Sequence, residues 1–383
     1  MNSEMSLSEF KHNTTKQASA KFHSMYRQFR HIRNLQRYQH GHIRRVVTDR
    51  SNPFHAMTEE EFLMRFRLSK ECTLSLIAKI EHRLPNALSN RGCPVPSHLQ
   101  VLIGLRYIAT GNDQLGISDW CDVSQSFVSR CVGKVAYAIG SLCAEFIKFP
   151  DQDNITRIKH EFMTIAGMPG VIGCIDCTHI AIEMPSHPRP EVFRNRKGYF
   201  SFNVQAVCGP QLQLYNIVAR WPGSAHDSNI FENSRLCQEL EDGILPGHLL
   251  GDSGYPCREY LLTPLTAPHG RGENRYNASH IRTRNSVERA FGLLKRRFAC
   301  LGKKMRTSMR NTKHIIVAAA VLHNLAIAYR VPEPDNVIHE LHDPDDPEAQ
   351  GNIQEDELRQ QPQAMRNIQG VFKRQQIIRE YFA

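Results

Sequence analysis

A run of apolar residues at positions 171–183, with the sequence VIGCIDCTHIAIE, predicts one buried β-strand. Valine, isoleucine and cysteine dominate the run, and β-branched residues suit a pleated, covered surface. The strand carries one acid in its middle, Asp176. A carboxylate in such a strand is costly unless it is paired or binds a metal ion. The run alone leaves open whether Asp176 is such an acid or lies at an exposed strand end or turn.

Two later segments predict elements that carry further acids. Residues 248–255, HLLGDSGY, predict a short strand that delivers Asp252 at its C-terminal end. Residues 285–298, NSVERAFGLLKRRF, have apolar positions at helical spacing, so they predict an amphipathic helix with Glu288 in its first turn. We expect the preceding residues, 267–284, to form a polar loop, because they are rich in arginine and lack an apolar period.

Three carboxylates that converge from two strands and a helix would repel one another, and cations relieve that repulsion. Ligands that are all oxygen atoms suit Mg²⁺ or Mn²⁺. Two such ions about 4 Å apart form the clamp used for in-line attack at phosphorus. The pattern therefore predicts a divalent-metal site made by Asp176, Asp252 and Glu288.

The pattern upstream of the core strand is helical. Thr58 followed by Glu61 has the form of a capping box before an apolar run, within a helical stretch at 53–84. Helices are also predicted at 97–110, at 117–121 and, with Ser124 as the N-cap, at 124–138.

The segment at 118–139 resembles a helix-turn-helix, whose second helix would present a polar face to DNA. Glutamine and arginine suit base edges, and serine suits phosphate. The alternative is an ordinary helical hairpin that supports the core. The residues predicted to contact DNA are Gln125, Ser126, Ser129, Arg130 and Lys134.

Further elements complete the predicted core. A helix is expected at 154–168, a hairpin with strands at 202–208 and 212–219, and an apolar helix at 311–330 whose His323 and Asn324 form hydrogen bonds in the core. Asp227 stands where a turn passes into a helix, so helix capping is one explanation of this acid.

Composition and charge point to an anionic partner. The chain of 383 residues has 48 basic and 38 acidic residues and a net charge of +10, and the basic residues cluster, which favours nucleic acid. The loop at 185–197 and the predicted helix at 285–298 supply candidate phosphate contacts, although a solvated loop is as good an explanation for the first. These candidates are Arg194, Arg196, Lys197, Lys295, Arg296 and Arg297.

The compartment and the ends of the chain can also be predicted. The 11 cysteines are spread thinly, as in an intracellular protein with reduced thiols, and no apolar run has the length of a membrane span or a secretory signal. Residues 1–52 form a basic arm, 331–364 an acidic linker that we expect to be disordered, and 365–383 a helix that docks on the helical region or binds a partner.

Four motifs together resemble the Harbinger-type DDE transposases and the nucleases derived from them. They are CIDCTHI, PGSAHDSNIF, GDSGYP and ERAFGLLKRRF, in this order between residues 97 and 329. Between Asp252 and Glu288 lie 35 residues, a spacing familiar among DDE enzymes. The resemblance implies an RNase H-like core with Asp176, Asp252 and Glu288 as its catalytic triad, and it implies a place near the metal for Asp227.

The resemblance completes the prediction. We expect an α/β protein with an all-α helix-turn-helix region at 53–150 and an RNase H-like DDE nuclease core, a mixed sheet with flanking helices, at 151–330. The implied activity is cleavage of DNA phosphodiester bonds with Mg²⁺ or Mn²⁺, in the nucleus and also the cytoplasm. The implied partners are DNA and a Myb-like DNA-binding protein, and homo-oligomer formation is left open. The alternative is a domesticated DNA-binding protein with a catalytically silent core; a small-molecule phosphohydrolase would need neither the basic loops nor the helix-turn-helix.

Overall fold

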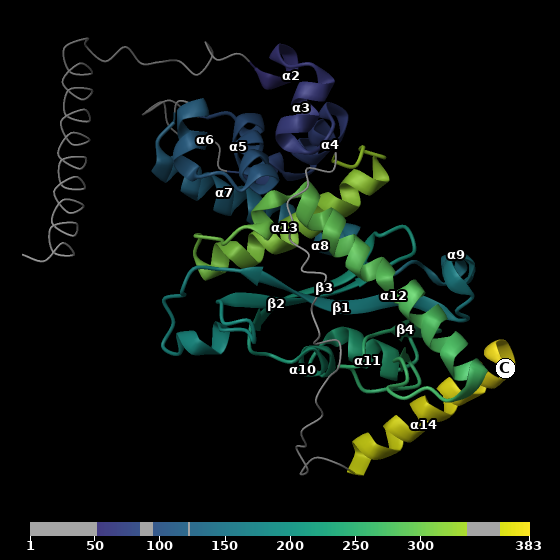
Figure 1. The fold of residues 1–383 in the computed structure, drawn as a ribbon. Coiled ribbons are helices and arrows are strands. Elements are labelled where there is room, and N and C mark those ends of the chain that lie inside the picture. The colour runs from purple at the N-terminus through teal and green to yellow at the C-terminus, as the bar shows by residue number, and fades with distance from the viewer. Residues whose placement is uncertain (1–51, 85–94, 122, 335–360) are drawn as a thin grey trace, which may run out of the picture. The chain divides into compact units, whose positions relative to one another are not determined.

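The computed structural model describes residues 52–84, 95–121, 123–334 and 361–383 (Figure 1). The chain divides into two compact units, one made of Met1–Ser51 with Ala87–Val95 and the other of Asn52–Asn86 with Pro96–Ala383. Every helix and strand below belongs to the second unit. The predicted basic arm at 1–52 and most of the predicted acidic linker at 331–364 lie outside the described residues.

A five-stranded mixed sheet forms the centre of the second unit, in the order β3-β2-β1-β4-β5. β1 pairs antiparallel with β2, and β2 with β3, whereas β1 with β4 and β4 with β5 are parallel. The predicted core strand, hairpin and acid-bearing strand are confirmed, and the strand order is new. The strands are β1 Val171–Ala181, β2 Ser201–Cys208, β3 Leu214–Pro222, β4 His248–Leu250 and β5 Leu261–Leu262.

Helices flank the sheet on both faces, which confirms the predicted mixed α/β architecture. α9 Gln152–Ala166, α12 Gly270–Arg297 and α13 Met309–Ala328 cover one face, and α10 Asp227–Glu232 and α11 Arg235–Glu241 cover the other (Figure 1). Short 3₁₀ turns stand at Pro190–Phe193 and Ala299–Gly302.

The region before the sheet is helical, as predicted. Its elements are α2 Pro53–Ala56, α3 Glu59–Phe66, α4 Lys70–Ile80, the 3₁₀ turn Glu81–Arg83, α5 Ser97–Thr110, α6 Gln114–Cys121, α7 Gln125–Gly140 and α8 Cys143–Phe146. The capping box of Thr58 and Glu61 is present. α7 packs against α5, α6 and α13, so this region is joined to the core through α13. No described helix is both long enough and apolar enough to cross a membrane.

The largest departure from the sequence prediction is α12. Residues 270–284, which were expected to lie in a polar loop, continue the helix, so Glu288 lies well inside it instead of in its first turn. The buried side of this half is made of Tyr276, Ser279, His280 and Thr283, at helical spacing. The polar groups find partners there: Thr283 Oγ1 donates to Ser279 O, and His280 Nε2 lies 3.0 Å from Leu262 O. Because the buried side of this half is made largely of hydroxyl and imidazole side chains, the sequence shows no apolar period there and the helix was not predicted.

The C-terminal helix, α14 Gln361–Ile377, continues into a π-helical turn at Ile378–Phe382. It packs on the first half of α12 and on β5, and not on the helical region where docking was predicted. Gly370 allows the close approach, because a Cβ there would meet Arg258 Cα at 2.5 Å. Lys373 Nζ and Arg374 Nη1 donate to the backbone oxygens of Glu259 and Thr263.

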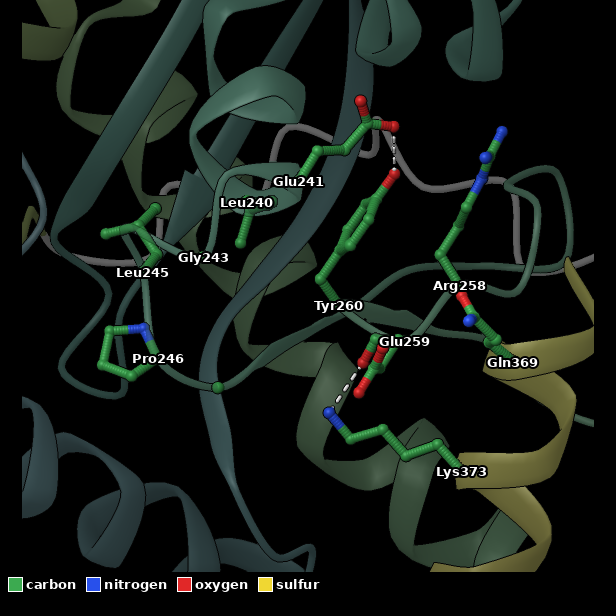
Figure 2. Close-up of a pocket in the computed structure, with 11 residues that line it drawn as sticks. Leu240, Glu241, Gly243, Leu245, Pro246, Arg258, Glu259, Tyr260, Gln369 and Lys373 are labelled. Carbon is green, nitrogen blue, oxygen red and sulfur yellow. Dashed lines mark hydrogen bonds between the residues drawn. The ribbon is translucent and has the colours of Figure 1, made fainter. Parts of the chain in front are cut away.

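A cavity of about 440 Å³ lies between α14 and the loop that joins α11 to β4 (Figure 2). Its lining includes Tyr260, whose hydroxyl donates to Glu241 at 2.8 Å, and Lys373. None of the four acids singled out by the sequence lines it. The cavity is therefore a feature of the α14 junction and not of the candidate site.

Candidate active site

Two of the predicted acids meet at one edge of β1. β4 pairs with β1 only as far as Cys174, so Asp176 lies just beyond the point where its neighbour strand ends. Asp252 follows the C-terminal end of β4 by two residues, and its Oδ1 accepts from Gly254 N at 3.0 Å. Because the two strands run parallel, the chain emerging from β4 delivers Asp252 beside Asp176.

Arg284 joins the third acid to this edge. Its guanidinium contacts Asp176 Oδ2 at 3.4 Å and Glu288 Oε1 at 2.7 Å, so one side chain of α12 bridges a strand acid and a helix acid. The side chains of Arg284 and Asp176 are only 18% and 17% exposed. Arg284 was not predicted as a site residue, because residues 267–284 were expected to form a polar loop. The available signal was its position four residues before Glu288, which puts both on one face of a helix.

The electrostatics indicate an excess of negative charge. Burial raises the pKa of Asp176 to about 7; Arg284 opposes the rise, and the charge of Asp252 adds to it. Burial also raises the pKa of Asp252, and the charge of Asp227 contributes in the same direction. Carboxylates that raise one another's pKa lie close enough to interact, so these acids form one electrostatic cluster.

Asp227 occupies a different place from the one that capping would give it. It is the first residue of α10, the N-cap is His226, and no side chain caps this helix. The Asp227 carboxylate instead accepts from Asn203 Nδ2 at 2.8 Å. Asn203, on β2, was not predicted as a site residue; it orients Asp227 from the sheet. Capping therefore does not explain this acid.

The donor chemistry fits a divalent metal ion, but the ligand set is not gathered. The available atoms are carboxylate oxygens, which suit Mg²⁺ or Mn²⁺. The raised pKa of Asp176 shows that a further cation would stabilise its charged form. Within the described residues, however, no three histidine, cysteine, aspartate or glutamate side chains are grouped to hold a metal ion. Arg284 is the positive charge now present between Asp176 and Glu288.

The basic residues predicted on α12 have three different environments. Lys295 Nζ donates to Thr178 Oγ1 at 2.7 Å and to His179 O at 3.4 Å, and burial lowers its pKa to about 8. Arg296 is exposed. Arg297 is 2% exposed and donates to Val331 O, so the predicted contact of Arg297 with DNA is wrong in this structure. The reason is helical phase, which turns Arg297 toward the buried side of α12.

The cations of the loop at 185–197 differ in their partners. Arg194 pairs with Glu191 at 2.6 Å and lies 4.4 Å from the centre of the Phe200 ring. Arg196 Nη2 lies 2.8 Å from His226 Nδ1, beside the residue that precedes Asp227. Lys197 is exposed. The structure thus brings Arg196 close to the acid cluster and gives Arg194 a role within the loop.

The predicted DNA-facing residues of α7 lie on one exposed side of that helix. They are Gln125, Ser126, Ser129, Arg130 and Lys134. The opposite side, which includes Val128, Cys131 and Val135, is buried against α5 and α13. The predicted exposure is confirmed, whereas their contact with DNA stays a prediction, because a supporting hairpin would bury the same side.

Comparison with known proteins gives consistent matches to one family. A family model described as "DDE superfamily endonuclease" matches residues 175–324. The human protein "Putative nuclease HARBI1" is 34% identical over 278 residues, covering 71% of this chain and 79% of that protein. The mouse protein of the same name is 37% identical over 62% of this chain and 70% of its own. "Protein ALP1-like" from Arabidopsis thaliana is 26% identical over 75% and 74%. No solved structure matches significantly.

Proposed function

From the premise that the chain belongs to the Harbinger transposase-derived nucleases of the DDE endonuclease superfamily, we propose that it is a divalent-metal-dependent endonuclease that cleaves DNA phosphodiester bonds. The observation that carries the proposal is the bridge of Arg284 between Asp176 and Glu288, beside Asp252 at the end of the parallel strand. An antiparallel hairpin joined through β1 to two parallel strands supports an RNase H-like core.

Asp176, Asp252, Glu288 and Asp227 would hold the metal ions. DDE endonucleases generally use divalent metals, which here would activate the attacking water or 3′-hydroxyl and stabilise the leaving oxygen. Asp176 would take the central position, because the charges of Asp252 and Asp227 both act on its carboxyl group and Arg284 joins it to Glu288. Asn203 fixes the carboxylate of Asp227 through its Nδ2 donor.

The cations beside the acids would bind the phosphate. Lys295 is held by Thr178 at the same edge of β1, so its ammonium is positioned before substrate arrives. Arg284 neutralises two acids in the free protein and would turn to the DNA phosphate once other cations neutralise them. Positive groups positioned in advance stabilise the charge that develops at phosphorus.

The regions outside the acid cluster supply the rest of the proposal. The exposed face of α7, together with Arg196, Lys197 and Arg296, would bind DNA away from the cut. A Myb-like DNA-binding partner, residence in the nucleus and the cytoplasm, and self-association are expected from the resemblance to the Harbinger family.

The substitution Asp252→Asn tests the nuclease. It keeps the size of the side chain but removes the charge that would hold a cation, so Mg²⁺- or Mn²⁺-dependent cleavage should be abolished while DNA binding survives. Stability without metal should hold or rise, because one member of a repelling cluster is neutral. Asp242→Asn, at the C-cap of α11, is the matched control and should cleave like wild type.

Two outcomes would contradict the assignment of Asp252. One is cleavage by the variant at the rate of wild type. The other is a loss of about 3 kcal/mol or more in metal-free stability, which is expected of a structural, paired acid.

The second candidate is a DNA-binding protein with a silent core. The observation in its favour is that the described acids are not grouped as a ligand set. Thermal melting separates the two candidates, since a metal that binds only the folded state raises the melting temperature. A nuclease should be stabilised by Mn²⁺, and Asp252→Asn much less so; a silent core should show neither the shift nor cleavage.

A further inference from the structure

One side of α12 carries arginines at a regular interval. They are Arg271, Arg275, Arg282, Arg289 and Arg296, here called the arginine ridge, and all five are exposed. The last four are spaced by seven residues, which returns a straight helix to within about 20° of the same direction. The ridge therefore runs as a nearly straight line along α12, over about 37 Å.

The helix surface between these arginines has short side chains and no acidic residue. Its positions are Ala278, Asn285 and Gly292, which are also seven residues apart. A Cβ placed on Gly292 would find only Arg296 Nη1 within 4 Å, at 3.6 Å, so the space above it is open. Small residues between long cations leave room for a bulky polymer to lie along the helix.

Internal contacts in the described residues involve Arg275 and Arg296, on either side of the two central arginines. Arg275 donates to Phe382 O at 3.4 Å and to Ala383 O at 3.5 Å, and the half-exposed Arg296 lies 3.8 Å from Glu333. Among the described residues, Arg282 and Arg289 have no ion pair or hydrogen bond. Two central cations on one line without a carboxylate between them are available to an external anion.

The ridge is distinct from the edge of α12 that faces the acids. Arg284 and Lys295 lie on that edge, where they contact Asp176 and Thr178 of β1, and Glu288 pairs with Arg284 there. Arg289 follows Glu288 directly and so projects about 100° further around the helix. The ridge therefore lies on a different side of α12 from Arg284, Glu288 and Lys295, and the two sides run parallel along the helix.

We propose that the arginine ridge is a binding track for the phosphate backbone of the duplex DNA that flanks the cleavage site. The proposal rests on the nuclease function above, and it adds a DNA-binding surface. Charges repeated along 37 Å suit a polyanion of regular charge, and this length is close to one turn of duplex DNA, about 35 Å. A single phosphate or a small acidic ligand would engage one or two of the arginines and would give no reason for a line of five.

The test is the salt dependence of DNA binding by the full chain in EDTA, where no cleavage takes place. The ridge variant is Arg282→Gln with Arg289→Gln. The matched control is Arg157→Gln with Arg235→Gln, which removes the same charge from exposed positions of α9 and α11. Each phosphate contact contributes about 0.9 to the slope of log binding constant against log salt. On a 30-base-pair duplex we expect the ridge variant to lower the slope by about 1.8 and the control to leave it unchanged.

A slope that is unchanged in the ridge variant, or that falls as much in the control, would overturn the track. The variant with lysine at positions 282 and 289 keeps the charges and should restore the wild-type slope, which separates loss of charge from loss of fold. Cleavage by the wild-type chain with Mn²⁺ is measured beside it. A ridge effect without cleavage would sustain the track and refute the nuclease, whereas cleavage without a ridge effect would refute the track alone.

Discussion

α12 and α13 cover the same face of the sheet and treat polar groups in opposite ways (Figure 1). α13 is buried along most of its length, and its polar residues His323 and Asn324 bind backbone groups at 2.7–2.8 Å. α12 is longer, exposes a line of arginines, and carries an acid bridged by Arg284. Polar groups on α13 complete the fold, whereas those on α12 leave charge available for ligands.

The largest expected effect tests the α13 half of this comparison. Asn324→Leu removes an acceptor for Leu214 N and a donor to Leu214 O and Phe146 O, and leaves these buried backbone groups unpaired. Each unpaired group costs about 1–3 kcal/mol, so we expect a loss of about 3–5 kcal/mol in urea unfolding. The same change on α12, Asn285→Leu at an exposed position, should cost under about 0.5 kcal/mol. Equal losses would remove the distinction between the helices.

The next effect concerns the charge beside α12. Burial raises the pKa of Asp176 from an ordinary 3.8 to about 7, so the folded protein binds this proton more tightly than the unfolded chain. The stability that the neutral acid provides is present below about pH 4 and is lost as the pH rises through 7. In EDTA, Asp176→Asn should match wild type near pH 4 and exceed it by about 2–4 kcal/mol at pH 8. A difference that does not vary with pH would show that Asp176 is not a strained acid.

The smallest of the three effects concerns what holds α12 in place. The π-helical turn that follows α14 packs on the first half of α12, whereas α13 packs on α7 and β3. Gly370→Ala would press a methyl group onto the backbone at Arg258, so we expect a loss of about 1–3 kcal/mol and faster hydrogen exchange in α12 than in α13. Gly116→Ala, on α6 with open space around it, should be neutral or stabilising. If Gly370→Ala leaves the free energy of unfolding unchanged, α14 does not pack tightly on the backbone at Arg258.

The sequence predicted what local patterns encode. β1 and β4 were found because a β-branched or apolar run contains a lone acid in β1 and leads to one after β4, and α13 because its apolar period is strong. The first half of α12 was missed because its buried side uses Ser279, His280 and Thr283. The pairing of β1 with β4, on which the strand order depends, joins segments more than 70 residues apart, and no local pattern encodes it.

The candidate site, like the fold, was predicted only where a local pattern reveals it. The acids could be chosen from their elements and from the family motifs, but their geometry depends on Arg284, which was placed in a loop. Arg297 was read as one of three adjacent cations, although the apolar positions Val287 and Leu294 already indicate that helical phase turns it inward. Charge is visible in a sequence, whereas the direction of a charged side chain requires the helix to be located first.

The end of β4 at Leu250 has a consequence for solubility. Between Cys174 and Ala181, where Met305 pairs with the chain again, β1 has no neighbour strand on one side, and such an open edge can recruit a strand from another molecule. Here the amide of Cys177 donates to the Asp176 side chain, and His179 O accepts from Lys295. These backbone groups of β1 are therefore already bonded to side chains and are not available to a strand of another molecule. The cluster proposed for catalysis therefore also covers this open edge, and we expect variants that neutralise both charges to be less soluble than wild type.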